Sequence, residues 1–172
     1  MLYGVSMTIV NVALPQLQGA MSATQDEVSW VVTLNIIATA IGTPLTGWFA
    51  IRIGRRALLI YSIVGFSIST LLCGTADSLE ALLVYRIAQG ALGAPLVPLA
   101  QAIVLDTYPR WQHAFANGIL GLAAVVGPAI APSIGGYLSE VFNWRWVFYL
   151  IVPLCVFALL GALRFIHDIE RE

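Results

Sequence analysis

Long apolar stretches separated by short charged segments are the feature that most constrains how this chain can fold. Only 10% of its residues are charged and 59% are hydrophobic, whereas about 25% of the residues in ordinary soluble domains are charged. Residues 28–51 carry no charge at all, and about 20 predominantly apolar residues suffice for a helix to cross a membrane. The pattern predicts an integral membrane protein, with the lipid bilayer as its main partner. It excludes a soluble globular domain and a disordered chain.

Six segments of this kind can be placed along the chain, and the connections between them are short. They cover residues 2–20, 28–51, 57–76, 79–105, 114–139 and 146–163. Membrane β-barrels use strands of about ten residues with alternating apolar and polar side chains, whereas these segments are longer and continuous. The sequence therefore predicts an all-α fold: a bundle of six transmembrane helices over residues 1–165, with neighbours antiparallel. Residues 166–172 are expected to begin a cytoplasmic linker.

The first segment has the shortest apolar length. From Leu2 to Pro15 a helix reaches only about 21 Å at 1.5 Å per residue, and extending it to residue 20 includes Asn11 and two glutamines. No basic residue precedes it, as a signal peptide would require. We expect the chain to begin inside its first helix, either as a fragment or from a late start codon.

The placement of the arginines predicts the orientation of the bundle. All eight basic residues are arginines, and the net charge is -1 with no basic patch, which argues against a nucleic-acid partner. The regions after the second, fourth and sixth segments carry most of them, at Arg52, Arg55, Arg56, Arg110, Arg164 and Arg171. The opposite side carries only Arg145 and most of the acidic residues. Because cytoplasmic loops are enriched in arginine and lysine, both termini are expected in the cytoplasm.

Arg86 is the one charge in the interior of a predicted helix. A charged side chain there costs several kcal/mol unless it is paired or hydrated, so it is expected to face a polar cavity or a partner. Gln89 lies three residues on, on the same helix face, and Gly90 narrows the helix beside it. The alternative is that the Arg86 side chain extends to the membrane interface.

The fifth segment contains small residues spaced four apart and two prolines. The small residues are Ala123, Gly127, Ala131 and Gly135, and the prolines are Pro128 and Pro132. Small residues at this spacing let another helix approach closely, and each proline removes a helical hydrogen bond. The sequence predicts a bent helix with a specialised packing face. The alternative is ordinary helix packing without a role beyond shape.

The connection after the second segment reads GWFAIRIGRR and is predicted to be a tight cytoplasmic turn. Its glycines and arginines are Gly47, Arg52, Gly54, Arg55 and Arg56. This arginine cluster could also serve the topology alone. Within the helices, Asn11 and Asn35 could line a cavity or bond to a neighbouring helix.

Enzyme chemistry is not indicated. The two cysteines, Cys73 and Cys155, and the two histidines are far apart in the sequence, which gives no disulfide framework and no metal-ligand spacing. We find no nucleophile and base pair and no phosphate-binding loop. Neither a metal nor an organic cofactor is expected.

Six phrases of the sequence, in order, resemble those of the major facilitator superfamily. GWFAIRIGRR resembles its loop motif G-x-x-x-D-R-x-G-R-R, RIAQGALGAP the motif R-x-x-Q-G, and GPAIAPSIGG the antiporter motif G-P-x-x-G-P-x-x-G-G. TIVNVALP, SWVVT and NWRWVFYLIVP are similar to phrases of its fourteen-helix drug:proton antiporters. The resemblance covers essentially the whole chain and is to the N-terminal half. It implies six helices in two inverted three-helix repeats, one half of a twelve-helix core.

The resemblance also implies an activity and a place for it. It implies export of small hydrophobic or cationic compounds across a bacterial inner or plasma membrane, with the proton gradient as the energy source. A second half, as a separate chain or a second copy, would complete the substrate path. The resemblance implies proton coupling and the cavity at Arg86, Gln89 and Gly90, and we group Asn11 with them as a candidate cavity residue because it is polar inside an apolar helix. A cytoplasmic latch is implied at the loop motif, and the bend and the contact to the other half at Gly127, Pro128, Pro132, Gly135 and Gly136.

The sequence departs from the family pattern at positions that carry charge. Ile51 replaces the acidic residue of the loop motif, and Ser6 stands where the antiporters have an aspartate in helix one. Asn35 replaces a tyrosine, and Ala131 replaces a glycine. These departures leave open the alternative of a non-transporting membrane remnant or an interaction subunit of a truncated transporter.

Overall fold

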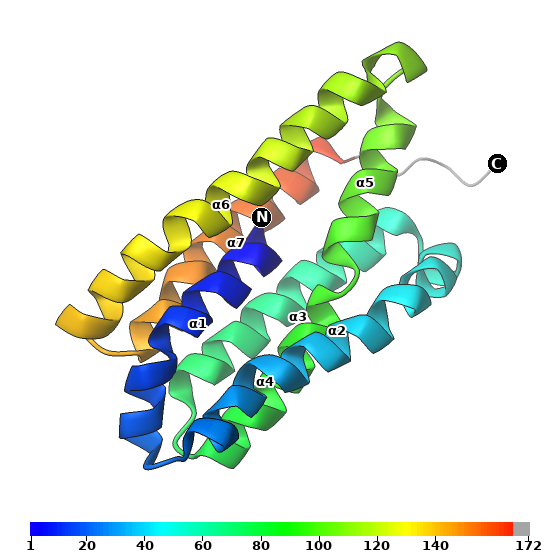
Figure 1. Cartoon of the computed structure of the whole chain (residues 1–172). Helices are drawn as coiled ribbons and strands as arrows, with labels where there is room; N and C mark the ends of the chain where they lie inside the picture. The colour runs from blue at the N-terminus through cyan, green and yellow to red at the C-terminus, as the bar shows by residue number, and fades with distance from the viewer. Residues whose placement is uncertain (167–172) are drawn as a thin grey trace.

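The computed structural model describes residues 1–166, and these residues form a bundle of helices without a strand (Figure 1). The helices are α1 (Leu2–Met21), α2 (Gln25–Ile53), α3 (Arg55–Thr75), α4 (Leu79–Gly93), α5 (Leu96–Thr107), the 3-10 helix η1 (Arg110–Gln112), α6 (His113–Val141) and α7 (Arg145–Phe165). The predicted all-α class is confirmed. Residues 167–172, where most of the predicted linker lies, are outside the described part.

Five helical stretches are long and apolar enough to cross a membrane: 25–53, 55–75, 79–107, 110–141 and 145–165. α1 is not among them, because Asn11, Gln16 and Gln18 lower the hydropathy of its 20 residues. Its buried face, which includes Val5, Ile9 and Leu17, nevertheless belongs to the hydrophobic core of the bundle.

The segment expected as one helix over 79–105 is divided into α4 and α5. The chain turns at Ala94 and Pro95, and proline has no N–H to donate to the preceding turn. Pro98 follows within the first turn of α5, where a missing N–H is tolerated. The span therefore crosses the bundle as two consecutive helices.

α2 begins at Gln25 rather than at residue 28, because Thr24 and Glu27 form a capping box there.

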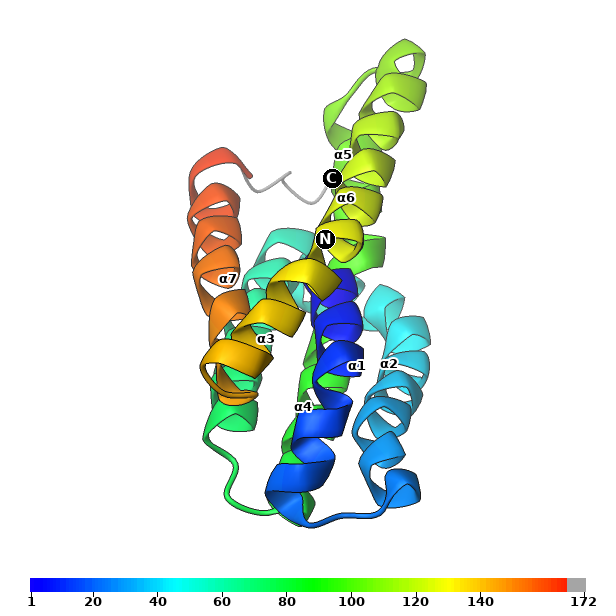
Figure 2. The ribbon, with the colours of Figure 1, turned by 60° about the vertical axis from the view of Figure 1, so that its left-hand side comes forward.

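The helices form two inverted repeats related by a pseudo-two-fold axis. α2 and α6 each have 29 residues, and α3 and α7 each have 21. The most extensive packing joins α2 to α4, α1 to α6 and α3 to α7, and the helices of the first two pairs run alongside each other in the views of Figures 1 and 2. If α1 is exchanged with α4, α2 with α6 and α3 with α7, the α2–α4 pair becomes the α1–α6 pair, and the α3–α7 pair is unchanged. This is the expected half of the superfamily fold.

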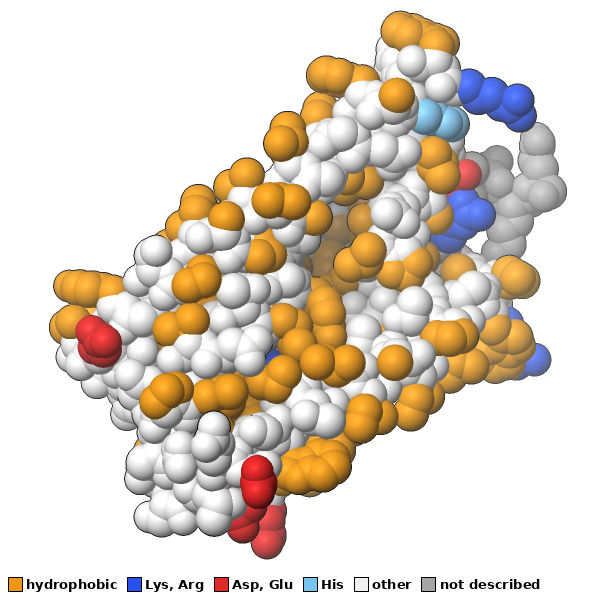
Figure 3. Space-filling model, in the orientation of Figure 1, with side chains coloured by type: hydrophobic (Ala, Val, Ile, Leu, Met, Phe, Trp, Pro, Cys, Tyr) orange, Lys and Arg blue, Asp and Glu red, His pale blue; other side chains and the backbone are white. Residues whose placement is uncertain are grey.

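The charges separate to the two ends of the bundle (Figure 3). The α2–α3 connection, the end of α5 and the start of α6 lie at one end, together with the arginines of the loop motif. The α1–α2, α3–α4 and α6–α7 connections lie at the opposite end, with acidic side chains such as Glu27 and Glu140. This separation is what the positive-inside rule requires, and the placement of the termini in the cytoplasm stays a prediction.

The small-residue face of α6 packs on α1. Gly127, Ala131 and Gly135 are buried, and Ala123 is half-buried. A Cβ atom on Gly127 would lie 2.8 Å from Cγ2 of Val5, and one on Gly135 would overlap Ile9. The stripe thus brings α6 against α1 of the same half, whereas the resemblance implies a contact to the other half.

The prolines and the last glycine of this motif lie beside the stripe. Pro128 and Pro132 are inside the continuous helix α6, and both are half-buried. α6 changes direction along its length (Figure 2). Pro128 also contacts α1, because a Cβ on Gly4 would lie 2.9 Å from its Cγ atom. Gly136 is less tightly packed, with Val12 at 3.7 Å from an added Cβ.

Gly135→Ala is expected to lower the stability of the bundle. The added methyl group must push Ile9 and separate α1 from α6, and overpacking of this kind typically costs ~1–3 kcal/mol. The measurement is the thermal unfolding temperature of the purified chain in detergent. Gly121→Ala on the same helix is the control, because an added Cβ there has no neighbour within 4 Å. Equal unfolding temperatures for the two variants would contradict close α1–α6 packing.

Candidate functional site

Arg86 lies in the interior of the bundle, two turns into α4, and its side chain is fully buried. The guanidinium is held by α1, α2 and α4 together. Its Nε donates to the backbone oxygen of Val31 at 3.0 Å, and Nη1 donates to Oγ of Ser6 at 3.4 Å and to Oε1 of Gln89. Nη2 lies 3.7 Å from Sδ of Met7. The side chain therefore does not extend to the membrane interface.

Gln89 extends the Arg86 network to α3. Its amide nitrogen donates to Oγ of Ser6 at 3.2 Å and to Oγ1 of Thr70 at 2.8 Å. Thr70 in turn donates to the backbone oxygen of Phe66 at 2.7 Å. Ser6, Gln89 and Thr70 are all buried. The guanidinium and the Gln89 amide thus connect four helices through neutral polar groups.

A second group of hydrogen bonds joins α2 to α4 beside Arg86. The Asn35 amide donates to the backbone oxygen of Arg86 at 2.8 Å and accepts from the Tyr3 hydroxyl at 3.2 Å. Thr39 donates to the backbone oxygen of Gly90 at 3.1 Å. A Cβ on Gly90 would overlap the Asn35 backbone oxygen, so the glycine is what allows the two helices to approach. Asn35, which could have lined a cavity, instead bonds to a neighbouring helix.

No carboxylate of residues 1–166 contacts the Arg86 guanidinium. The acidic side chains of this part of the chain are exposed, at Asp26, Glu27, Asp77, Glu80, Asp106 and Glu140. The positive charge is instead solvated by a backbone carbonyl, a hydroxyl and an amide, and burying a charge is tolerated only with such partners. The arrangement can hold a cation within the bundle, but these partners include no group that exchanges protons as a carboxylate does.

Asn11 is not part of this network. Its side chain is exposed and donates to the backbone oxygen of Met7, one turn earlier in α1, at 3.0 Å. Asn11 and Arg86 share only their polarity inside apolar helices. The positions of Ser6 and Asn11 around the α1 axis explain why only the first points to α4, and sequence alone does not fix that rotation.

The loop motif is brought together with the end of α5. Arg55 forms an ion pair with Asp106, and Gly54 makes the turn between α2 and α3 with a φ of 94°, a conformation favourable only to glycine. The Arg52 guanidinium lies 4.3 Å from the ring centre of Trp48. Ile51, which replaces the family's acidic residue, is 80% exposed. The ion pair with Asp106 was not foreseen, because 50 residues separate its partners. Gly47 has open space around it.

Comparisons with known proteins decide the family. The model of the Major Facilitator Superfamily matches residues 1–172. The chain belongs to the Major Facilitator Superfamily. The predicted resemblance is thereby confirmed, and the membership indicates a transport protein rather than an enzyme.

Relatives within the Major Facilitator Superfamily carry export and resistance names. The chain is 38% identical over 96% of its length to the "Multidrug export protein EmrB" of Haemophilus influenzae, and 36% identical over 96% to the protein of that name in Escherichia coli K12. It is 37% identical over 86% of its length to the "Fatty acid resistance protein FarB" of Neisseria gonorrhoeae. The matches cover 32%, 32% and 29% of these relatives. The chain therefore spans about a third of their length.

A cavity of about 590 Å³ lies at the start of α1 in this superfamily member. α3, α5, α6 and α7 also contribute to its lining. The lining is mostly apolar, with Gln101 and Asn117 as its amide side chains. Gln101 lines this cavity, whereas Gln89 belongs to the Arg86 network.

Proposed function

We propose that this chain is the N-terminal half of a proton-coupled antiporter that exports small hydrophobic or cationic compounds. The observation that carries the proposal is the fully buried Arg86, held by α1, α2 and α4. A charge inside a membrane bundle is costly and marks a functional position by default. The export names of EmrB relatives that match over almost the whole chain support the same activity.

The proposal includes a second half. The described helices form one set of inverted repeats, and a path between two halves needs the other set. A separate chain or a second copy of this one would supply it. The membrane would be the bacterial inner or plasma membrane with both termini in the cytoplasm. The proton gradient would be the energy source, with no other cofactor.

A second candidate is a non-transporting membrane protein, either a remnant or an interaction subunit. It is favoured by the absence of a carboxylate beside Arg86 within residues 1–166, where Ser6 is the partner from α1. The exposed Ile51 adds to this, because it leaves the loop motif without its acidic residue.

Dye efflux separates the two candidates. Cells that express the chain are loaded with ethidium, and efflux is followed with and without a protonophore, alongside chemical cross-linking of the chain in its membrane. The half-transporter predicts protonophore-sensitive efflux only where a cross-linked dimer or a partner half is present. Robust proton-dependent efflux by a chain that stays monomeric would contradict the need for a second half. No efflux from a stably inserted chain, with or without a partner, would favour the non-transporting candidate.

A further inference from the structure

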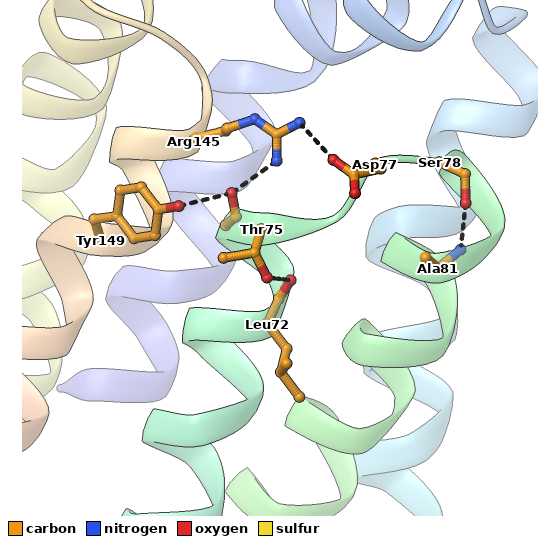
Figure 4. Close-up of polar contacts among 8 residues, drawn as sticks. Leu72, Thr75, Asp77, Ser78, Ala81, Arg145 and Tyr149 are labelled. Atoms are coloured by element: carbon orange, nitrogen blue, oxygen red, sulfur yellow. Dashed lines mark hydrogen bonds and ion pairs between the residues drawn. The ribbon is translucent and has the colours of Figure 1, made fainter.

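Two arginines bridge α3 and α7 at opposite ends of this helix pair. Arg145, the first residue of α7, donates from Nη1 to the backbone oxygen of Gly74 at 2.9 Å, near the end of α3 (Figure 4). Arg56, the second residue of α3, donates from Nη2 to the backbone oxygen of Leu163 at 3.3 Å, near the end of α7. Each helix thus begins with an arginine that bonds to the end of the other.

The two bonds are equivalent under the internal repeat. A single shift of 89 positions in the sequence carries Arg56 to Arg145 and also carries Gly74 to Leu163. α3 and α7 have the same length of 21 residues and are antiparallel neighbours in the bundle. The same contact is therefore made twice, once at each end of the interface between the two repeats.

The physical reason for an arginine at both places is the helix end that it reaches. The last four carbonyl oxygens of a helix have no intrahelical partner, and the C-terminus carries a partial negative charge that favours a cation. Hydrogen bonds from a charged donor are also stronger than neutral ones. At the Gly74 carbonyl the contact is tightened by Tyr149, whose hydroxyl donates to the same oxygen at 3.1 Å.

Membrane topology does not explain Arg145. It lies on the side that carries the acidic residues, where the positive-inside rule disfavours arginine. Its ion pair with Asp77, at 3.7 Å, is weak because the Asp77 side chain is 98% exposed. The Arg145 guanidinium also lies 4.6 Å from the centre of the Trp144 ring, but that contact is within its own chain segment, and the hydrogen bond to Gly74 is the one that ties the arginine to the end of α3.

We propose that Arg56 and Arg145 form a reciprocal clamp that holds the two inverted repeats in one register, so that the six-helix half moves as a rigid body. Arg56 is then a positioning residue within the half, in addition to any part it has in a cytoplasmic latch. Loss of one arginine should loosen one end of the α3–α7 interface. Loss of both should allow the helices to slide. The clamp does not depend on whether the chain transports a substrate.

The accessibility of the two native cysteines can report on whether the α3–α7 interface opens at its Arg145 end or in its middle. Cys73 precedes Gly74 at the Arg145 end, and Cys155 lies in the middle of α7; both thiols are fully buried. The experiment measures the rate at which N-ethylmaleimide alkylates each cysteine of the full chain in lipid vesicles. Arg145→Met is expected to raise the Cys73 rate by about tenfold, equivalent to ~1.4 kcal/mol of local stability. Arg56→Met should leave Cys73 protected, and only the double variant should expose Cys155.

Three controls keep this test decisive. Tyr149→Phe leaves Arg145 on the Gly74 carbonyl and should keep the Cys73 rate near that of the unmodified chain. Arg145→Lys retains a cation at the end of α3, so its Cys73 alkylation rate should lie between those of Arg145→Met and the unmodified chain. If Arg145→Met fails to insert into the membrane, the Cys73 rate in Arg145→Lys still tests the clamp. Arg110→Ala removes an exposed arginine from the α5–α6 connection and should change neither rate. An unchanged Cys73 rate in Arg145→Met, or an equal rise in Arg110→Ala, would overturn the clamp, as would exposure of Cys155 by either single variant.

Discussion

Arg86→Ala is expected to abolish efflux by any active assembly of this chain and to destabilise the bundle. The substitution removes the donor to the Oε1 atom of Gln89 and a second hydrogen bond to the Val31 carbonyl inside α2, and it leaves a cavity where the guanidinium was. A buried polar group that loses its partner costs ~1–3 kcal/mol. For the unpaired Gln89 oxygen and the cavity together we expect about 3 kcal/mol, which lowers the unfolding temperature by roughly 6–12 °C in a chain of this size.

Arg86→Lys separates the charge from the geometry. Lysine keeps the positive charge but offers one compact donor group, which cannot reach α1, α2 and Gln89 as the planar guanidinium does. We expect efflux reduced at least about tenfold, with a smaller loss of stability than in Arg86→Ala. Ethidium efflux and thermal unfolding in detergent are measured on the same preparations, with Arg110→Ala as an exposed-arginine control. Full efflux in Arg86→Ala would remove Arg86 from the transport mechanism.

The sequence was sufficient to locate five of the spans, because membrane helices are marked by length and hydropathy. The break between α4 and α5 was missed although its signal, Pro95 followed by Pro98, was present. A segment chosen by apolar length alone hides such a break, since proline is itself compatible with an apolar stretch. A proline pair alone is not a sufficient signal, because α6 stays continuous through Pro128 and Pro132.

The partners of Arg86 could not be predicted in the same way. Ser6 lies 80 residues from Arg86, and Thr70, which bonds to Gln89, lies 19 residues from that glutamine. These contacts depend on how each helix is rotated about its axis. Hydropathy does not fix this rotation in a membrane, because lipid-facing and buried positions are both apolar. For the same reason Asn11 could not be distinguished from Asn35. The small residues of α6 indicated a packing face, but they did not indicate that α1 packs on it.

The Arg56 and Arg145 pair shows what the internal repeat adds. Taken alone, Arg56 is explained by the positive-inside rule, whereas Arg145 lies on the side where that rule disfavours arginine. The equivalence becomes visible only when the two acceptor carbonyls, at Gly74 and Leu163, are known from the structure. An alignment of the two repeats would match Arg56 with Arg145, but it would not show which carbonyl oxygens the two arginines bind.

Gly90→Ala is expected to be the most damaging single-methyl change in the helix that carries Arg86. The added Cβ would overlap the backbone oxygen of Asn35 and would lie 3.1 Å from Oγ1 of Thr39. A backbone atom inside a helix cannot rotate away as a side chain can, so α2 and α4 must separate. That separation breaks the bonds from Thr39 to the Gly90 carbonyl and from Asn35 to the Arg86 carbonyl. We expect a loss of about 3 kcal/mol, at the upper end of what overpacking costs.

Gly93→Ala, one turn further along α4, is the matched control. Its nearest neighbour would be Cδ2 of Phe66 at 2.9 Å, a side-chain atom rather than a backbone atom of another helix. Both variants replace a glycine of α4 with alanine, which favours the helix by up to about 1 kcal/mol, so a lower unfolding temperature of Gly90→Ala reports the effect of the α2 backbone. Because the displaced α2 also supplies the Val31 carbonyl to the guanidinium, Gly90→Ala should lose efflux together with stability, whereas Gly93→Ala should retain most of both. Equal unfolding temperatures for the two variants would show that α2 is free to move and that Gly90 does not set the geometry of the Arg86 network.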